Sequence, residues 1–510
     1  DNAVVSIRKF DKLTPVVVIT YDLIPLLYEQ EYSNSNLKYK HFYEEKLDYL
    51  KAKSLLIISQ STLKSVTEIL DPPSLKIGTR THKTRKEIID KLMKTIAHNA
   101  ILMNASNEAL LSISRAISIN FPEETLKKKL LIDVSQLAIS DLKTGVHRAV
   151  RAISQVWITQ KVQSYDVIPV QFVTENKNCI CRSVKHYKGN ILNNDSIFLG
   201  DVIEPNKDDI FIGLDLTGII NEVVNMGLLE QWRHRGVGIH FVVYDILPLL
   251  HPEWWSAYTK KSHEGWLYSI IKSSDSLISI SKSVSLEVQQ WIQDNSIHLA
   301  RPLAFKCFHL GADIHSSKPS FGMPDSSSQV LKKIHSKTSF LMVGTIEPRK
   351  GYTQTLAAFE QLWLLGGELN LVIIGKQGWM VDKMIKKIKR HKELNRRLFW
   401  LDGISDEYLE KVYQSCHCLI AASLGEGFGL PLIEAAQKKM PIIARDIPVF
   451  KEVAGDHAFY FKGEKAEDLV SSLKQWLELY KDKKHPISDD MPWLTWQQSA
   501  EQLLGAIGID

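Results

Sequence analysis

The chain has 510 residues, too many for one hydrophobic core, so roughly three domains of ordinary size are expected. Its composition, 44% hydrophobic and 24% charged, is that of a globular protein, and the small net charge of +5, spread along the chain, gives no indication of a nucleic-acid partner. Five cysteines, an odd number, favour free thiols in a reducing compartment, and no apolar run is long enough to span a membrane, so we expect a cytoplasmic protein.

The first part of the chain contains an internal repeat. The sequence VVVITYDLIPLL at residues 16–27 parallels HFVVYDILPLL at residues 240–250. Further on, LLIISQS at 55–61 parallels LISISKS at 277–283. Any two Rossmann-like units share a strand-turn-helix texture, which is the alternative explanation, but two matches in register favour a duplicated segment.

The repeat is incomplete, because nothing between residues 70 and 121 resembles the later unit at 339–480. We therefore predict a partial Rossmann-like repeat over 1–83, inert by itself, and a helical linker over 84–128. The chain also begins almost inside a predicted strand, which suggests that it was cut from a longer protein.

From residue 129 onward, short β-branched runs alternate with helical patterns, which is typical of parallel βαβ layers. A stretch rich in Ser, Pro, Gly and Asp at 310–339 is predicted to be an interdomain linker. The fold class is thus α/β, with two Rossmann-like domains at 129–325 and 326–510 facing a cleft. The predicted strands are 129–134, 210–214, 239–244, 276–280, 339–343, 369–374, 398–401, 418–421 and 440–444.

A candidate glycine loop, DVSQLAISDLKTGVHR, follows the first of these strands. It looks like the glycine loop of bacterial polysaccharide mannosyltransferases, and this likeness implies that Gly145 gives a sugar donor access, with His147 and Arg148 beginning the next helix on the acceptor side. Arg148 would otherwise anchor the loop through Asp133 or Asp141, and the sequence leaves both interpretations open.

Asp245 ends a later strand of the same domain and is a second acceptor-side candidate. Many relatives have a histidine-containing motif at this place, so two roles remain open for Asp245: orienting an acceptor hydroxyl, or capping the turn that follows.

The second domain begins with MVGTIEPRKGY directly after its first strand. Paired cations in a closed cleft stabilise the negative charge of a departing diphosphate, which makes Arg349 and Lys350 candidate catalytic residues and Gly344 a candidate for donor contact. Many relatives have arginine where this chain has Thr345, so Lys350 is the firmer of the two assignments.

Two further candidates follow later strands. Lys376 ends the second strand and either faces the cleft or is an ordinary surface lysine. By resemblance, the nucleotide base lies near the loop LDGISD, where Gly403 would let backbone atoms reach the base edge.

The sequence SLGEGFGLPLIE at residues 423–434 is the strongest motif, because it follows a buried strand and opens a helix. Its glycines allow a tight turn and close approach, and the amides of a helix N-terminus bind anions such as phosphate. Glu426 and Glu434 bracket the loop with seven residues between them, and a carboxylate can accept two hydroxyl hydrogen bonds, as a ribose diol or a sugar ring requires.

This motif resembles the E-x7-E motif of retaining GT-B glycosyltransferases, above all glycosyltransferase family 4, and the likeness covers about residues 129–476. It implies that Glu434 holds the donor ribose and that Glu426 lies near the donor sugar. It also implies no metal and no cofactor, since fixed positive charge replaces the metal. The residues implied to contact the diphosphate or sugar through their backbone are Gly427, Phe428, Gly429 and Leu430.

The implied function is transfer of a hexose, mannose from GDP-mannose, onto a growing surface polysaccharide such as O-antigen. Implied partners are the nucleotide-sugar donor, a glycan or lipid-linked glycan acceptor and, with less support, the inner face of the cell membrane or glycan-assembly proteins. Two alternatives remain: a non-catalytic subunit that binds glycan or partner proteins, and a GT-B sugar-nucleotide epimerase, which would need no acceptor.

Overall fold

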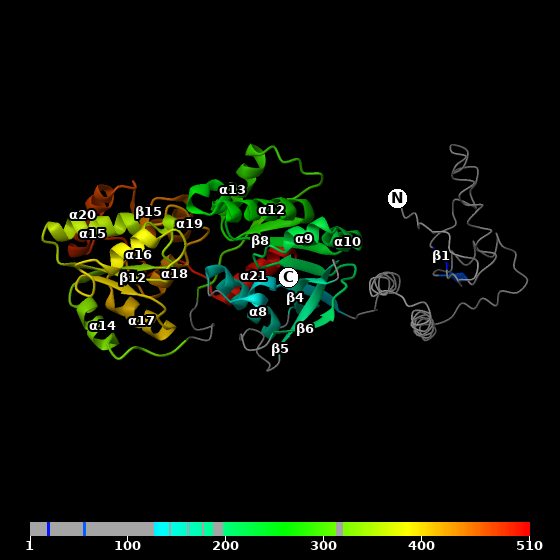
Figure 1. Cartoon of the computed structure of the whole chain (residues 1–510), viewed down its shortest axis with the longest axis horizontal. Helices are drawn as coiled ribbons and strands as arrows, with labels where there is room; N and C mark the ends of the chain where they lie inside the picture. Colours follow the sequence, from blue (N-terminus) through cyan, green and yellow to red (C-terminus); the bar gives the residue numbers. More distant parts are fainter. Residues whose placement is uncertain are drawn as a thin grey trace, which may run out of the picture. The chain divides into compact units, whose positions relative to one another are not determined.

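The computed structural model divides the chain into two units, Asp1–Leu110 and Leu111–Asp510. The second unit contains two Rossmann-like domains, each built around its own sheet (Figure 1), which confirms the predicted α/β fold. All nine predicted strands are present, with ends that differ by at most two residues. The structure describes residues 127–509 except 142–143, 161, 163, 176–177, 187–196 and 313–319, together with two short strands of the first unit.

Those two strands, β1 (Val18–Thr20) and β2 (Leu55–Ile57), pair in parallel with Val18 opposite Leu55. The sequence repeat aligns these residues with Phe241 and Leu277, which also lie opposite each other in a parallel pair of strands. The strand register therefore repeats together with the sequence. The rest of the predicted repeat and nearly all of the predicted helical linker lie outside the described residues.

The first domain has an eight-stranded sheet in the order β10-β9-β8-β7-β3-β4-β5-β6. The strands from β10 to β4 are parallel, whereas β5 and β6 add an antiparallel edge that the sequence analysis missed. The elements are β3 (Lys128–Asp133), α7 (Ser135–Ile139), α8 (Gly145–Gln160), β4 (Tyr165–Glu175), β5 (Asn178–His186), β6 (Ile197–Val202), β7 (Ile210–Gly213), α9 (Ile220–Asn225), α10 (Leu228–His234), β8 (Gly238–Val243), α11 (Leu247–Leu250), η1 (Pro252–Trp254), α12 (Ala257–Ser273), β9 (Ser276–Ser279), α13 (Lys282–Asp294) and β10 (Ala304–Cys307).

The second domain has a six-stranded parallel sheet in the order β13-β12-β11-β14-β15-β16. This is the 3-2-1-4-5-6 order of Rossmann folds, whose ligands bind where the order reverses, here between β11 and β14. The elements are α14 (Ser327–His335), β11 (Thr338–Val343), η3 (Pro348–Lys350), α15 (Tyr352–Leu364), β12 (Leu369–Ile374), α16 (Asp382–Lys389), β13 (Leu398–Leu401), α17 (Asp406–Ser415), β14 (Cys418–Ala421), α18 (Leu430–Gln437), β15 (Ile442–Arg445), α19 (Pro448–Ala454), η4 (Gly455–His457), β16 (Phe459–Phe461) and α20 (Ala466–Lys481).

The predicted linker at 310–339 is only partly correct. Its last third forms helix α14, which packs against β11 and α17 of the second domain. Ile334 is fully buried and Val330 and Leu331 pack against the core, so these apolar residues at helical spacing outweigh the polar composition of the segment.

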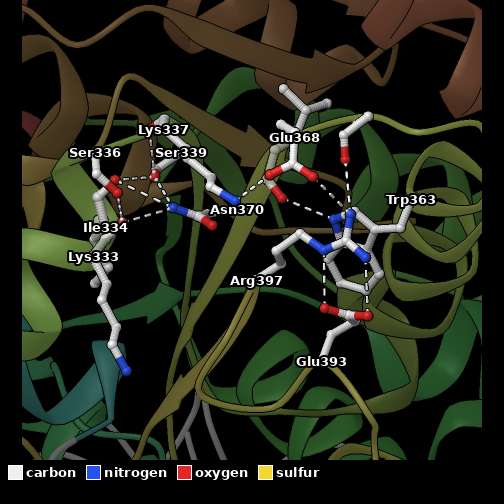
Figure 2. Close-up of polar contacts among 12 residues, drawn as sticks. Lys333, Ile334, Ser336, Lys337, Ser339, Trp363, Glu368, Asn370, Glu393 and Arg397 are labelled. Carbon is white, nitrogen blue, oxygen red and sulfur yellow. Dashed lines mark hydrogen bonds and ion pairs between the residues drawn. The ribbon is translucent and has the colours of Figure 1, made fainter.

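A polar network fixes the amino-terminal edge of the second sheet (Figure 2). The Asn370 amide on β12 donates to Ser339 Oγ on β11 at 3.0 Å, and Arg397, just before β13, forms two 2.9 Å hydrogen bonds with Glu393. The Arg397 guanidinium also lies 5.6 Å from the centre of the Trp363 ring. Because parallel strands end together, the loops that follow their carboxyl ends lie at the opposite edge of the sheet. A ligand site is therefore expected among those loops.

The last helix, α21 (Trp496–Ile507), returns to the first domain, although the sequence analysis placed all of residues 326–510 in the second. It packs against α8, where Trp157 Nε1 donates to the carbonyl of Ala500 at 3.2 Å. Just before it, Leu494 accepts a backbone hydrogen bond from Ala312. The chain therefore crosses between the two domains twice.

All five cysteines are free thiols, as expected, and Cys179, Cys181 and Cys418 are buried in the sheets. No helix in the described part of the chain is both long and apolar enough to cross a membrane.

Candidate functional site

The predicted cations and the first predicted glutamate meet where the strand order of the second sheet reverses. Lys350, in the short helix η3 after β11, places Nζ 2.6 Å from Glu426 Oε1, in the loop after β14. Arg349 Nη1 lies 2.7 Å from the other oxygen, Oε2, and 2.8 Å from the Gly425 carbonyl. The two cations therefore hold both oxygens of one carboxylate. The sequence analysis did not predict this contact, because it assigned the cations to the diphosphate and Glu426 to the donor sugar.

This cluster is nearly dry, since the side chains of Glu426, Arg349 and Lys350 are only 11%, 12% and 15% exposed. Burial alone would raise the pKa of Glu426, but the charges of Arg349 and Lys350 and the hydrogen bonds from Lys350 and Ser423 outweigh it and lower this pKa to about 2. Glu426 is therefore ionised at neutral pH, and the cluster has one positive charge in excess of this carboxylate.

Glu347 is a second carboxylate in the cluster that the sequence analysis missed. Its Oε2 accepts from Arg349 Nε at 2.9 Å, and burial raises the pKa of Glu347. The sequence did contain a signal for this contact, because Glu347 lies two residues before Arg349 and directly before the proline that starts η3. Glu347 fixes the orientation of the Arg349 guanidinium.

A pocket adjoins the cluster at the start of helix α18. Gly429 caps this helix in a left-handed conformation, with φ of 103°, and a Cβ atom there would lie 2.8 Å from the Phe450 ring. The first turn of a helix leaves amides without intrahelical partners, which favours an anion. The pocket is lined among others by Lys350, Tyr352, Ser423, Glu426, Gly429 and Pro431.

The second predicted glutamate, Glu434, lies on α18 and its side chain is 6% exposed. Its Oε1 accepts from Arg148 Nη1 of the first domain at 2.6 Å, and its Oε2 accepts from the Tyr413 hydroxyl at 2.9 Å. Arg148 thus pairs with Glu434 rather than in either way considered from the sequence, while Asp133 accepts from Ser135, and Arg151 lies beside Asp141.

The loop between the two glutamates contacts the first domain directly. A Cβ atom on Gly427 would lie 2.1 Å from the Tyr244 carbonyl oxygen, so only glycine permits this approach. The Gly427 carbonyl accepts from Ser281 Oγ at 2.8 Å, and the Phe428 ring meets His309 edge-on at 5.5 Å. Three predicted site residues, Gly427, Phe428 and Gly429, thus shape the loop by packing.

An aromatic contact joins the domains beside this loop, and the sequence analysis missed it. Trp379, in the loop after β12, stacks on Trp255 at 4.6 Å and donates from Nε1 to the Trp254 carbonyl at 2.8 Å. The Trp254 ring in turn lies against Gly425. The adjacent tryptophans at the end of η1 were a visible signal, but their partner comes from the other domain.

Other predicted residues lie near these contacts or away from them. Gly344 has φ of +133°, and its carbonyl accepts from the Tyr352 hydroxyl at 2.6 Å, close to Lys350. A Cβ atom on Gly145 would lie 3.8 Å from Leu430 of the second domain, so the two loops adjoin.

Two donor-side candidates, Lys376 and Gly403, are exposed, and the structure gives them no contact with the Glu426 cluster. His147 is buried within its own domain, with Nδ1 3.6 Å from Asp141 Oδ1, rather than exposed to an acceptor. Of the two roles left open for Asp245, the turn cap is present: its Oδ1 accepts from Leu247 N at 3.2 Å.

No three His, Cys, Asp or Glu side chains are grouped to hold a metal ion among the residues that the structure describes. The chemistry available at the site comes from two buried cations, two glutamates and the start of a helix.

Comparison with known proteins shows what the chain resembles. Residues 325–489, which make up most of the second domain, match the family model of Glycosyl transferases group 1. The fold is GT-B: sucrose-phosphate synthase from Thermosynechococcus elongatus aligns with 75% of this chain and 96% of its own, with a TM-score of 0.50 and 13% identity. This match confirms the expected GT-B fold.

Particular relatives are bacterial mannosyltransferases. The serotype-specific mannosyltransferase WbdA of Escherichia coli is 46% identical over 391 residues, which cover 75% of this chain and 46% of WbdA. The O-antigen chain mannosyltransferase RfbU of Salmonella typhimurium is 28% identical over 150 residues, covering 29% of this chain and 41% of RfbU. The chain thus spans about half the length of the curated relatives it matches.

Proposed function

We propose that the protein is a retaining mannosyltransferase of glycosyltransferase family 4 that moves mannose from GDP-mannose onto a growing O-antigen or similar surface glycan. The observation that supports this proposal best is the contact of Arg349 and Lys350 with Glu426 at the reversal of strand order, beside the start of a helix. The similarity to WbdA and RfbU supports mannose as the sugar and O-antigen as the product.

The reaction needs stabilisation of the leaving group more than it needs a strong nucleophile. As the bond between the sugar and the diphosphate breaks, negative charge grows on the phosphate oxygens, and fixed positive groups in a dry site stabilise it. Lys350 and Arg349 supply two cations, and the first turn of α18 supplies backbone amides.

In the proposed step the acceptor hydroxyl attacks the sugar from the side on which the diphosphate departs. The C–O bond to the diphosphate breaks, the new C–O bond forms on the same face, and the hydroxyl proton passes to the departing phosphate oxygen. Glu426, ionised and held by both cations, faces the developing positive charge of the sugar. Glu434 binds the ribose hydroxyls of the nucleotide.

The observed geometry favours an enzyme over a non-catalytic binding subunit. Enclosing two cations and a carboxylate costs solvation, and a module that only bound glycan would need no such cluster. A sugar-nucleotide epimerase, the other alternative, would change a stereocentre of the donor sugar and would need no acceptor.

The test is a panel of GDP-, UDP-, ADP- and dTDP-sugars against wild type, Glu434→Ala and the exposed control Glu501→Ala. GDP-mannose at about a hundred times its Kd should stabilise wild type and the control by about 2.7 kcal/mol, and the Glu434 variant far less. GDP release that depends on an added mannose oligosaccharide would support transfer. If GDP appears without any acceptor, or no nucleotide sugar stabilises the wild type, the proposed function is wrong.

A further inference from the structure

Arg148 occupies a position that its own helix does not explain. It lies in the first turn of α8, where the helix dipole disfavours a cation, and its side chain is only 26% exposed. One turn later, Arg151 pairs with Asp141 inside the same domain. Arg148 instead extends to the other domain, where its Nη1 donates to Glu434 Oε1 at 2.6 Å.

The contact leaves Glu434 able to bind a ligand. An ionised carboxylate offers about four acceptor positions, two on each oxygen. Arg148 uses one position on Oε1, and the Tyr413 hydroxyl uses one on Oε2. Within the part of the chain that the structure describes, one position on each oxygen is left, which matches the two adjacent hydroxyls of a ribose.

The two donors also fix the plane of the carboxylate. Arg148 comes from α8, Tyr413 from α17 and Glu434 from α18, so three elements from two domains determine one orientation. Burial alone would lower the pKa of the Arg148 guanidinium, but the charge and hydrogen bond of Glu434 outweigh it and raise this pKa, so Arg148 is a cation where the domains meet.

We propose that Arg148 is a donor-positioning residue supplied by the opposite domain. It holds the Glu434 carboxylate ready for the ribose diol of a nucleoside diphosphate, so that tight nucleotide binding requires the two domains to be in contact. This assignment rests on the proposed function and moves Arg148 from the acceptor side to the ribose end of the donor site. By reciprocity, a bound nucleotide favours the closed contact to the same extent.

Calorimetric titration with GDP and with inorganic pyrophosphate separates the ribose end from the diphosphate end. We expect Arg148→Gln to weaken GDP binding by about tenfold, as loss of a charged hydrogen bond predicts, with pyrophosphate affinity unchanged. Glu434→Gln should behave alike, and the double variant should bind GDP no more weakly than Glu434→Gln alone. Arg151→Gln, on the same helix, is the matched control and should bind both ligands like wild type.

Three results would overturn the assignment. Unchanged GDP affinity in Arg148→Gln would make the ion pair purely structural, and tighter GDP binding would mean that Arg148 competes with the ribose. Equal losses for GDP and pyrophosphate would move Arg148 to the diphosphate. Arg148→Met, which keeps an apolar stem but carries no charge, provides the same comparison if the glutamine variant does not fold. A wild type that binds pyrophosphate but no nucleotide would refute the proposed function itself.

Discussion

Adding one methyl group at Gly427 tests whether the observed contact between the domains is the one used in catalysis. In Gly427→Ala the new Cβ would lie 2.1 Å from the Tyr244 carbonyl oxygen and 3.3 Å from Asp245 Cβ. A carbon–oxygen contact needs about 3.3 Å, so the domains must separate locally by about 1.2 Å. Gly427 does not have a left-handed backbone, so alanine fits the loop itself and the clash is confined to the contact.

A misplacement of about 1 Å costs about a hundredfold in rate, and we expect that loss in kcat for GDP release with saturating donor and acceptor. The melting temperature should stay within about 2 °C of wild type, because each domain keeps its own core. Gly505→Ala, in a helix where a Cβ meets no atom within 4 Å, is the control and should keep full activity. A wild-type kcat in Gly427→Ala would refute the reasoning, since catalysis would then not need this contact.

Three further outcomes are expected. The pKa of Glu426 is lowered from the usual 4.5 to about 2, which implies about 3 kcal/mol of stability. This stability is present above pH 4.5 and is lost as pH falls towards 2. Urea denaturation at pH 7 should therefore find Glu426→Gln less stable than wild type by about that amount. Burial and then the charge of Asp245 raise the pKa of Glu287 to about 7, so the folded state binds this proton more tightly than the unfolded state. As pH rises from 4.5 to 7, the wild type should therefore lose about 3 kcal/mol of stability relative to Glu287→Gln. An equal difference between the two proteins at both pH values, measured by denaturation, would contradict this. Trp379→Ala removes a stacked ring and a hydrogen bond worth about 1 to 3 kcal/mol together, and should reduce kcat at unchanged melting temperature, whereas Trp379→Phe, which keeps a ring, should lose less.

Local sequence predicted much of this protein because its site is built from loops that follow strands. Lys350 and Glu426 were each predicted in a loop that follows a strand, and the structure shows that these two strands are neighbours, so the loops meet at the same edge of the sheet. The prediction of the fold succeeded for the same reason, as each buried strand is a short apolar run followed by a helix.

Contacts between distant segments could not be predicted in this way. Arg148 and Glu434 are 286 residues apart, and nothing near either residue specifies the other. The pairing of Trp255 with Trp379 likewise depends on how two domains meet. Polar composition at 310–339 concealed helix α14, because the three apolar residues that bury it are spread over a single turn and a half.

The double crossing of the chain limits how the cleft can open. Each crossing, one after Ala312 and one before Leu494, is a covalent tether, and the two meet in a backbone hydrogen bond. For two domains joined at two nearby places, we expect opening to be a rotation about the line through those places, with the loops furthest from the line moving most. If the chain were cut near residue 490 to express the second domain alone, helix α21 would be separated from that domain. A first domain expressed without α21 would then expose the apolar face of α8.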